Sequence, residues 1–178
     1  MDIPNVIGDW QEYQSEEWAG LRVRVHSLKK DTPSRGRRDE ARGLTYVSFQ
    51  VTFENRGKEF YNIDMRRHPG DFQVRVGADG HAAFFDEYAS KLIVDYNLYP
   101  PRRATAVIYV AATPARLKQI DIQISPDIDD QAAFGYHWVG GLGIHEGSTR
   151  AGARASTAKP SVVNQVEQFL KDTAPGDA

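Results

Sequence analysis

Residues 43–57, GLTYVSFQVTFENRG, alternate between apolar and other side chains, and this alternation constrains the fold more than any other stretch. The apolar positions are Val47, Phe49, Val51 and Phe53. A period of two places these side chains on one face of an extended strand. Glu54-Asn55-Arg56-Gly57 follows with turn chemistry, because Asn and Gly readily adopt positive φ. The stretch therefore predicts a β-strand with one buried face, one wetter face and a turn at its end.

Other short segments between turn signals also predict strands. They are residues 21–25, 60–65, 72–76, 81–85, 105–111 and 120–124, of which residues 21–25, 72–76 and 120–124 alternate in the same way. Gly77-Ala78-Asp79-Gly80 predicts a hairpin turn, with residues 81–85 as a single return strand. Residues 88–99 have some helical spacing, but Ile93-Val94 and the following prolines favour an irregular crossing. Strands separated by turn signals, with little helix between them, predict an all-β antiparallel sandwich.

The composition of the chain changes after residue 126, so we expect the sandwich to span residues 1–126. Residues 127–159 are rich in Gly, Ala, Ser, Asp and Thr, and predict a linker that carries an aromatic island at Phe134, Tyr136 and Trp138. Residues 160–172 have apolar side chains at helical spacing and predict a short amphipathic helix. Residues 173–178 form a tail.

Length, charge and cysteine content limit the classes of function. The 178 residues suit one domain with a tail, and a net charge of -2 gives no global positive field to recruit nucleic acid. The chain has no cysteine, which excludes a disulfide framework. It has no signal-peptide pattern and no apolar run of about 18 residues. We expect a cytoplasmic protein without a membrane span, or a secreted one if an export signal is missing from this sequence.

Several of these segments, taken in order, resemble a known family. They are Gly20-Leu21-x-Val23-x-Val25-x-Ser27-Leu28, Phe53-Glu54-Asn55-Arg56-Gly57-Lys58, and residues 72–80, 106–111 and 117–124. The order is similar to that of immunoglobulin-like, telokin-like bacterial domains, which are mostly of unknown function and often extracellular. The similarity covers residues 7–125. It implies an immunoglobulin-like sandwich used for binding, and it implies no catalytic residues.

Two departures from that family are visible. Its members usually follow a signal peptide or membrane segment, and none is present here. The Pro-Gly that usually precedes the penultimate strand reads Pro100-Pro101-Arg102-Arg103 in this chain.

The motifs of common enzyme classes are incomplete. His145-Glu146-Gly147-Ser148-Thr149 begins like a zinc-protease helix but has Thr where the second His is required. Gly141-Leu142-Gly143-Ile144-His145-Glu146-Gly147 is one residue away from a dinucleotide-binding pattern and lacks its strand–helix context. There is no Gly-x-Ser-x-Gly elbow and no cysteine nucleophile. We expect no catalytic residues and no cofactor, although residues far apart in the sequence could still assemble a site in space.

Three aspartates form the candidate metal site. Asp127, Asp129 and Asp130 offer oxygen ligands of the kind that calcium prefers, but their loop lacks the glycine bend of a calcium-binding loop. The alternative is a capped strand end. His137 and His145 could contribute to a ligand or metal site if the segment folded back.

Four arginines form a candidate anion site within the loop of residues 29–42. They are Arg35, Arg37, Arg38 and Arg42. Such a loop would bind phosphate or an acidic surface with strong salt dependence. The alternative is a solvated mobile loop.

Two further segments have the composition of protein contact surfaces. The first contains Tyr88, Tyr96, Tyr99, Arg102 and Arg103, and Tyr and Arg are enriched at interfaces. The second is the apolar face of the predicted helix, with Val163, Val166, Phe169 and Leu170. Docking of both segments on the sandwich itself is the alternative. The sequence therefore predicts a non-catalytic module for protein interaction or self-association; the alternative is a sandwich that binds a ligand or a calcium-type ion.

Overall fold

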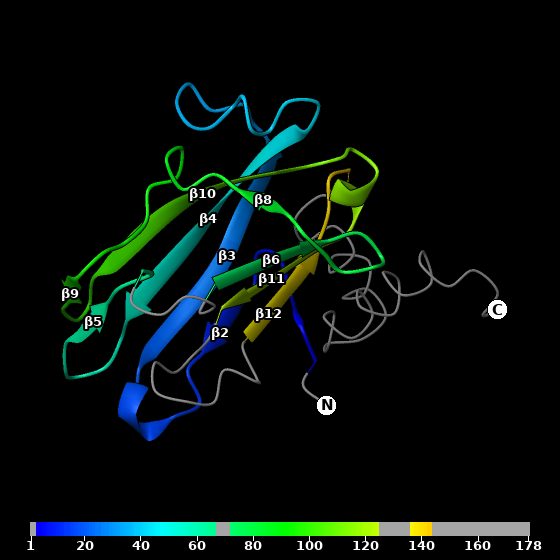
Figure 1. Cartoon of the computed structure of the whole chain (residues 1–178). Helices are drawn as coiled ribbons and strands as arrows, with labels where there is room; N and C mark the ends of the chain where they lie inside the picture. Colours follow the sequence, from blue (N-terminus) through cyan, green and yellow to red (C-terminus); the bar gives the residue numbers. More distant parts are fainter. Residues whose placement is uncertain (1–2, 67–71, 125–135, 144–178) are drawn as a thin grey trace, which may run out of the picture.

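The computed structural model describes residues 3–66, 72–124 and 136–143, and in them two five-stranded sheets face each other (Figure 1). The first sheet has the order β2-β3-β4-β10-β8, formed by Trp10–Glu12, Leu21–Lys30, Thr45–Asn55, Arg103–Ala112 and Phe84–Phe85. The second has the order β1-β12-β11-β6-β7, formed by Asn5–Val6, Tyr136–Gly140, Ile120–Ile124, Phe72–Val76 and His81–Ala82. A two-stranded ribbon pairs β5 (Tyr61–Ile63) with β9 (Tyr96–Leu98). The predicted all-β sandwich is confirmed.

The core lies between the two sheets. The apolar face of β4 is buried as predicted, with Phe49 and Val51 fully excluded from solvent. These side chains belong to one cluster with Val74, Ile122 and Trp138 of the facing sheet. Burial of one such side chain contributes about 1.5–3 kcal/mol, so alternation along these strands is sufficient to fix which face is inward.

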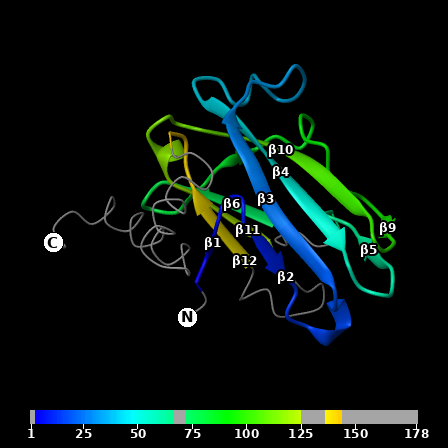
Figure 2. The ribbon, with the colours of Figure 1, turned by 180° about the vertical axis from the view of Figure 1, so that it is seen from behind.

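The other face of β4 is also largely buried, and the expectation of a wetter face is wrong for most of this strand. Tyr46, Ser48, Thr52 and Glu54 are all at most 6% exposed. β4 is the middle strand of its sheet, between β3 and β10 (Figure 2). Side chains of both neighbours contact its outer face, as Arg22 and Arg103 do at Glu54. Alternation in one strand cannot reveal this cover, because it comes from distant residues.

The segment of residues 81–85 is two strands instead of one. The hairpin turn at residues 77–80 is confirmed, and β7 pairs with β6. The chain then passes through Ala83, whose N–H donates to Val74 O, and β8 pairs with β10 in the other sheet. The chain continues in one direction through the switch of sheet, so the sequence of residues 81–85 gives no sign that two strands are present.

Residues 88–99 form the irregular crossing that Ile93-Val94 and the following prolines favoured. Lys91 bridges to Val107, β9 pairs with β5, and a cis peptide bond joins Pro100 to Pro101. The helical alternative is wrong.

β12 lies within the stretch predicted as a linker, and that interpretation is wrong for Tyr136–Gly140. The strand pairs with both β1 and β11. Trp138 is fully buried, and its indole N–H donates to Asp9 O at 3.0 Å. Tyr136 and Trp138 of the aromatic island could have indicated a buried strand, but the small and polar residues around them predicted a linker. Asp127, Asp129, Asp130, His145 and the helix with Val163, Val166, Phe169 and Leu170 lie outside the described residues.

Replacement of Trp138 by alanine tests whether β12 is an integral strand. Trp138→Ala should lower the free energy of unfolding by about 3–5 kcal/mol, since it empties a large site in the core. Urea denaturation measures the change, and Phe60→Ala, at a side chain 50% exposed, is the matched control. A loss for Trp138→Ala no larger than that of the control would contradict the placement of β12.

Candidate binding surface

Asn55, the last residue of β4, organises one end of the sandwich. It is fully buried, and its side-chain amide donates to Glu59 O at 2.7 Å and to Leu98 O at 2.8 Å. Its side-chain oxygen accepts from the N–H of Gly57 at 2.9 Å, and its backbone N–H donates to Arg102 O at 3.0 Å. One side chain thereby joins β4, the turn after it and the end of β9.

The turn after Asn55 requires glycine at its point of closest approach. A Cβ on Gly57 would lie 2.5 Å from Ala19 O, and Gly20 opposite it has a φ of +84°. The chain does turn after β4, but the bend lies at residues 57–59 and not at 54–57, and neither Asn55 nor Gly57 has the positive φ on which the prediction rested; the glycine serves close packing against the start of β3.

Exposed apolar side chains lie on and beside the ribbon of β5 and β9, and we call them the aromatic patch. Its members are Phe60, Val94, Tyr96 and Tyr99, with exposed fractions of 50%, 44%, 41% and 52%. They are four of the six large apolar side chains exposed among the described residues. The rings of Phe60 and Tyr99 lie 5.0 Å apart between centroids. Phe60 and Tyr99 therefore lie side by side on one face of the ribbon, whereas the register places Tyr96 opposite Ile63, on the other face.

The tyrosines predicted as one contact surface are divided by the structure. Tyr96 and Tyr99 belong to the aromatic patch, and Arg102 is attached to it through its N–H, which donates to Tyr99 O at 2.9 Å. Tyr88 is 69% exposed and lies instead under the guanidinium of Arg37, 4.4 Å from its ring centroid.

The arginine loop of residues 29–42 is anchored by a buried carboxylate. Asp86 is fully buried and accepts from the backbone N–H of Arg37 and from the hydroxyl of Tyr46, each at 2.7 Å. Burial, together with the hydrogen bond to Asp86, raises the pKa of Tyr46 far above its usual value. Two of the arginines pair with acids of the same loop, Arg37 with Glu40 and Arg42 with Asp39. Arg35 and Arg38 are exposed, and the anion site on this loop stays a prediction.

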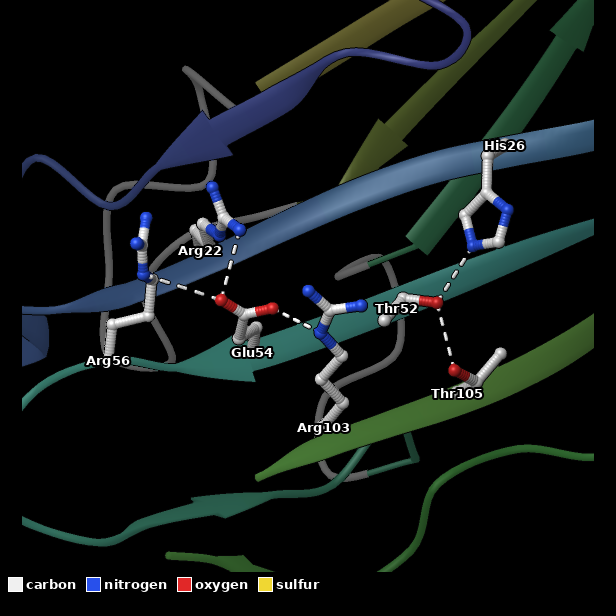
Figure 3. A network of polar contacts seen from close by, with 7 residues as sticks. All are labelled: Arg22, His26, Thr52, Glu54, Arg56, Arg103 and Thr105. Carbon is white, nitrogen blue, oxygen red and sulfur yellow. Dashed lines mark hydrogen bonds and ion pairs between the residues drawn. The ribbon is translucent and has the colours of Figure 1, made fainter. Parts of the chain in front are cut away.

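A second group of arginines surrounds Glu54 on the outer face of the first sheet, and Figure 3 shows it from close by. The register places Arg22 of β3, Glu54 of β4 and Arg103 of β10 in one row across the strands. Arg22 contacts the Glu54 carboxylate at 3.0 Å and Arg56 contacts it at 3.4 Å, and Arg103 binds its other oxygen. Burial alone would raise the pKa of Glu54, but the hydrogen bond from Arg103 and the charge of Arg22 outweigh it and lower the pKa.

Trp10 of β2 lies opposite Arg24, in the next row, and its ring reaches back over this one. The guanidinium of Arg22 lies 4.0 Å from its ring centroid, and those of Arg103 and Arg24 lie at 5.5 and 5.8 Å. We call Arg22, Arg24, Arg56 and Arg103 the arginine cluster. Sequence analysis singled out only Arg103 of these. Alternation in β3 places Arg22 and Arg24 outward, but only the register of three strands reveals that they meet Arg103.

Hydrogen bonds between side chains cross the next row of the same face (Figure 3). His26 Nε2 lies 2.8 Å from Thr52 Oγ1, which lies 2.9 Å from Thr105 Oγ1. The chain of contacts satisfies a threonine that is nearly buried on β4. Such hydrogen bonds allow the middle strand to carry buried polar side chains.

His137 was predicted as a possible ligand and lies on β12 beside Asp121 of β11. Its Nδ1 is 2.9 Å from Asp121 Oδ1, and this hydrogen bond raises the pKa of His137. Its suggested companion, His145, lies outside the described residues. Within residues 3–66, 72–124 and 136–143, no group of three or more acidic or histidine side chains is placed to hold a metal ion. No helix in these same ranges is long and apolar enough to cross a membrane.

A recess of about 320 Å³ opens where the chain changes sheets between β7 and β8. Its lining includes Phe72, Val74, Arg75, Ala83 and Phe85. The lining is mixed, with one cationic side chain, and binding of a ligand by the sandwich stays a prediction.

Comparison with known proteins identifies the fold. No family model matches the chain, and no curated protein matches it. The YjhA protein of Bacillus subtilis is similar in structure, with a TM-score of 0.52 at 11% identity over 75% of this chain and 97% of that one. MPT63, a secreted protein of Mycobacterium tuberculosis, has a TM-score of 0.51 at 13% identity over 78% of this chain and 97% of its own.

At such low identity these likenesses show the fold alone. The chain is a β-sandwich with an arrangement of strands that recurs in bacterial proteins.

Removal of the Asn55 amide should loosen this end of the sandwich. Asn55→Ala leaves the carbonyl of Leu98 buried without its donor and should lower the free energy of unfolding by about 2–3 kcal/mol. Chemical denaturation measures the loss. Asn97→Ala, at an exposed asparagine of β9, is the control and should change stability by about 0.5 kcal/mol or less. Equal effects of the two substitutions would contradict the anchoring role of Asn55.

Glu54 should make stability depend on pH in the acid range. Its pKa in the folded protein lies below the usual value of about 4.5, so its ion pairs stabilise the fold fully above that pH. The stabilisation is lost as the pH falls through the lowered pKa. The difference in unfolding free energy between the unaltered chain and Glu54→Gln should therefore be largest near neutral pH and shrink below about pH 4.5. A difference that stays constant between pH 7 and pH 3 would contradict this assignment.

Proposed function

We propose that this chain is a non-catalytic β-sandwich module that binds another protein through the aromatic patch. The observation that carries the proposal is the pair of rings Phe60–Tyr99, which lie 5.0 Å apart between centroids and are each about half exposed. Clustered exposed apolar groups are typical of protein contact sites, whereas single ones are common on any surface.

The energetics of association favour such a patch. An aromatic side chain covers 150–250 Å² when buried, and aromatic residues are frequent among those that contribute most of the binding energy. The patch is also held in place before any partner arrives. β5 pairs with β9, and Asn55 fixes both the turn before Phe60 and the carbonyl of Leu98. A preformed surface loses less conformational entropy on binding.

The surroundings of the patch have the polar character of an interface rim. Arg102 and Lys58 are exposed at its border, together with Glu59 and Asp95. A polar rim around an apolar centre is the usual anatomy of a protein interface. The resemblance to immunoglobulin-like, telokin-like domains supports a binding role, and the predicted helix of residues 160–172 is a second contact element in this proposal.

Loss of the rings of Phe60 and Tyr99 should strongly weaken binding of the partner. Phe60→Ala/Tyr99→Ala should weaken it by about 100-fold or more, because two central aromatic contacts are removed. Affinity capture followed by titration of the captured protein measures the loss, and light scattering of the full chain at rising concentration tests a second copy as the partner.

The matched control is Ile3→Ala/Tyr88→Ala, which removes two side chains that are 57% and 69% exposed outside the patch. The control should leave the affinity unchanged within about twofold. If both double variants bind alike, or if neither a captured protein nor a second copy depends on Phe60 and Tyr99, the proposal is wrong.

A further inference from the structure

The arginine cluster is continuous with the aromatic patch. Tyr99 O accepts from the N–H of Arg102, whose own carbonyl accepts from Asn55, and β10 begins at the next residue, Arg103. Arg56 follows Asn55 directly at the end of β4. The backbone that carries the ring of Tyr99 therefore lies next to the backbone that carries Arg56 and Arg103, within reach of one extended segment.

The cluster carries more hydrogen-bond donors than its own carboxylate can use. Arg22, Arg56 and Arg103 share Glu54, whose two oxygens offer about four lone-pair sites to roughly fifteen guanidinium N–H groups. The side chain of Glu54 is 8% exposed, whereas those of Arg56 and Arg103 are 59% and 60% exposed. Most of the donors on these two arginines therefore remain accessible to a ligand.

The guanidiniums are held in position before a ligand binds. Glu54 lies in the middle of the Arg22–Glu54–Arg103 row and binds both arginines, and the ring of Trp10 lies near both guanidiniums. Planar guanidinium groups match the geometry of a carboxylate with two parallel hydrogen bonds. Asp9 and Glu12 lie on or beside β2, so the local excess of positive charge is modest. Recognition by geometry is therefore favoured over attraction by net charge.

We propose that the arginine cluster binds carboxylates of an acidic segment of the partner protein, while apolar or aromatic side chains of the same segment lie on the aromatic patch. This inference rests on the proposed function and specifies the chemistry of the partner. The expected ligand contains both acidic and aromatic residues. The arginine cluster alone would select only the acidic residues, and the aromatic patch alone only the apolar ones.

Two polymers serve as probes for the full chain, poly-L-glutamate and a random copolymer of glutamate and tyrosine. Fluorescence anisotropy of labelled polymer should show binding of both, with the copolymer bound more tightly because its rings reach the patch. Binding should weaken as salt is raised from 50 to 300 mM, since exposed charge pairs are screened. Absence of poly-L-glutamate binding at low salt would overturn the inference.

Arg56→Gln/Arg103→Gln tests the cluster and leaves Arg22 paired with Glu54. It should weaken binding of both polymers by about tenfold, as expected for the loss of two exposed charge contacts. Arg35→Gln/Arg42→Gln removes the same charge from the arginine loop and should change binding by less than about twofold. Equal losses in the two variants would show that net charge alone attracts the polymer, and would overturn the inference. Urea denaturation confirms that each variant is folded, and Arg56→Lys/Arg103→Lys, which keeps the charge but loses the planar group, should still weaken binding.

Phe60→Ala/Tyr99→Ala separates this inference from the proposed function. It should remove the advantage of the copolymer and leave poly-L-glutamate binding intact. If it changes neither polymer while the arginine variant weakens both, acid recognition stands and the aromatic patch fails. If only the aromatic variant has an effect, the patch stands and the inference fails. Tighter binding of heparin than of poly-L-glutamate would assign the cluster to a sulfated polymer and overturn the acidic protein segment.

Discussion

Burial of β4 on both faces is the constraint on which the rest of the structure depends. Its apolar face is covered by the second sheet, so every polar group on its other face must find a partner within the fold. Glu54 is satisfied by arginines from β3 and β10, and Thr52 by His26 and Thr105. A buried carboxylate without such partners would destabilise the strand by several kcal/mol. The arginine cluster is thus first needed to pair the buried carboxylate of Glu54. Arginine side chains are long, so part of each guanidinium extends beyond Glu54 and its donors are exposed.

Asn55 is the last residue of β4, and the exposed segments of the aromatic patch adjoin it. An amide that both donates and accepts can replace three missing backbone partners at a strand end, and here it does so for the turn and for β9. The aromatic patch is consequently rigid although it lies outside the two main sheets. The buried side chain of Asn55 holds the backbone at this end of the sandwich, and four apolar side chains of the adjoining segments are exposed to solvent.

Local patterns in the sequence were sufficient to predict which segments form strands, but not which strands pair with one another. Period-two alternation predicted β3, β4, β6 and β11, because one buried face is enough to produce it. It could not predict the switch of sheet at Ala83 or the insertion of β12 between β1 and β11, since both depend on pairing between distant segments. The candidate site shows the same limit. Tyr96 and Tyr99 were found from composition, whereas Arg22, Glu54 and Trp10 meet only through the register of four strands.

The edges of the two sheets favour a partner that contacts side chains over one that adds a strand. The edge strands β1, β2, β7 and β8 are two or three residues long. β3 continues beyond β2, but there Ser27 adopts a φ of 58° at a break in register, and the exposed Lys29 and Lys30 follow. Short, bulged and charged edges oppose the regular pairing that strand addition requires. A partner is therefore expected to use the two surfaces where side chains are both exposed and held in place, the aromatic patch and the arginine cluster, and these adjoin at Asn55.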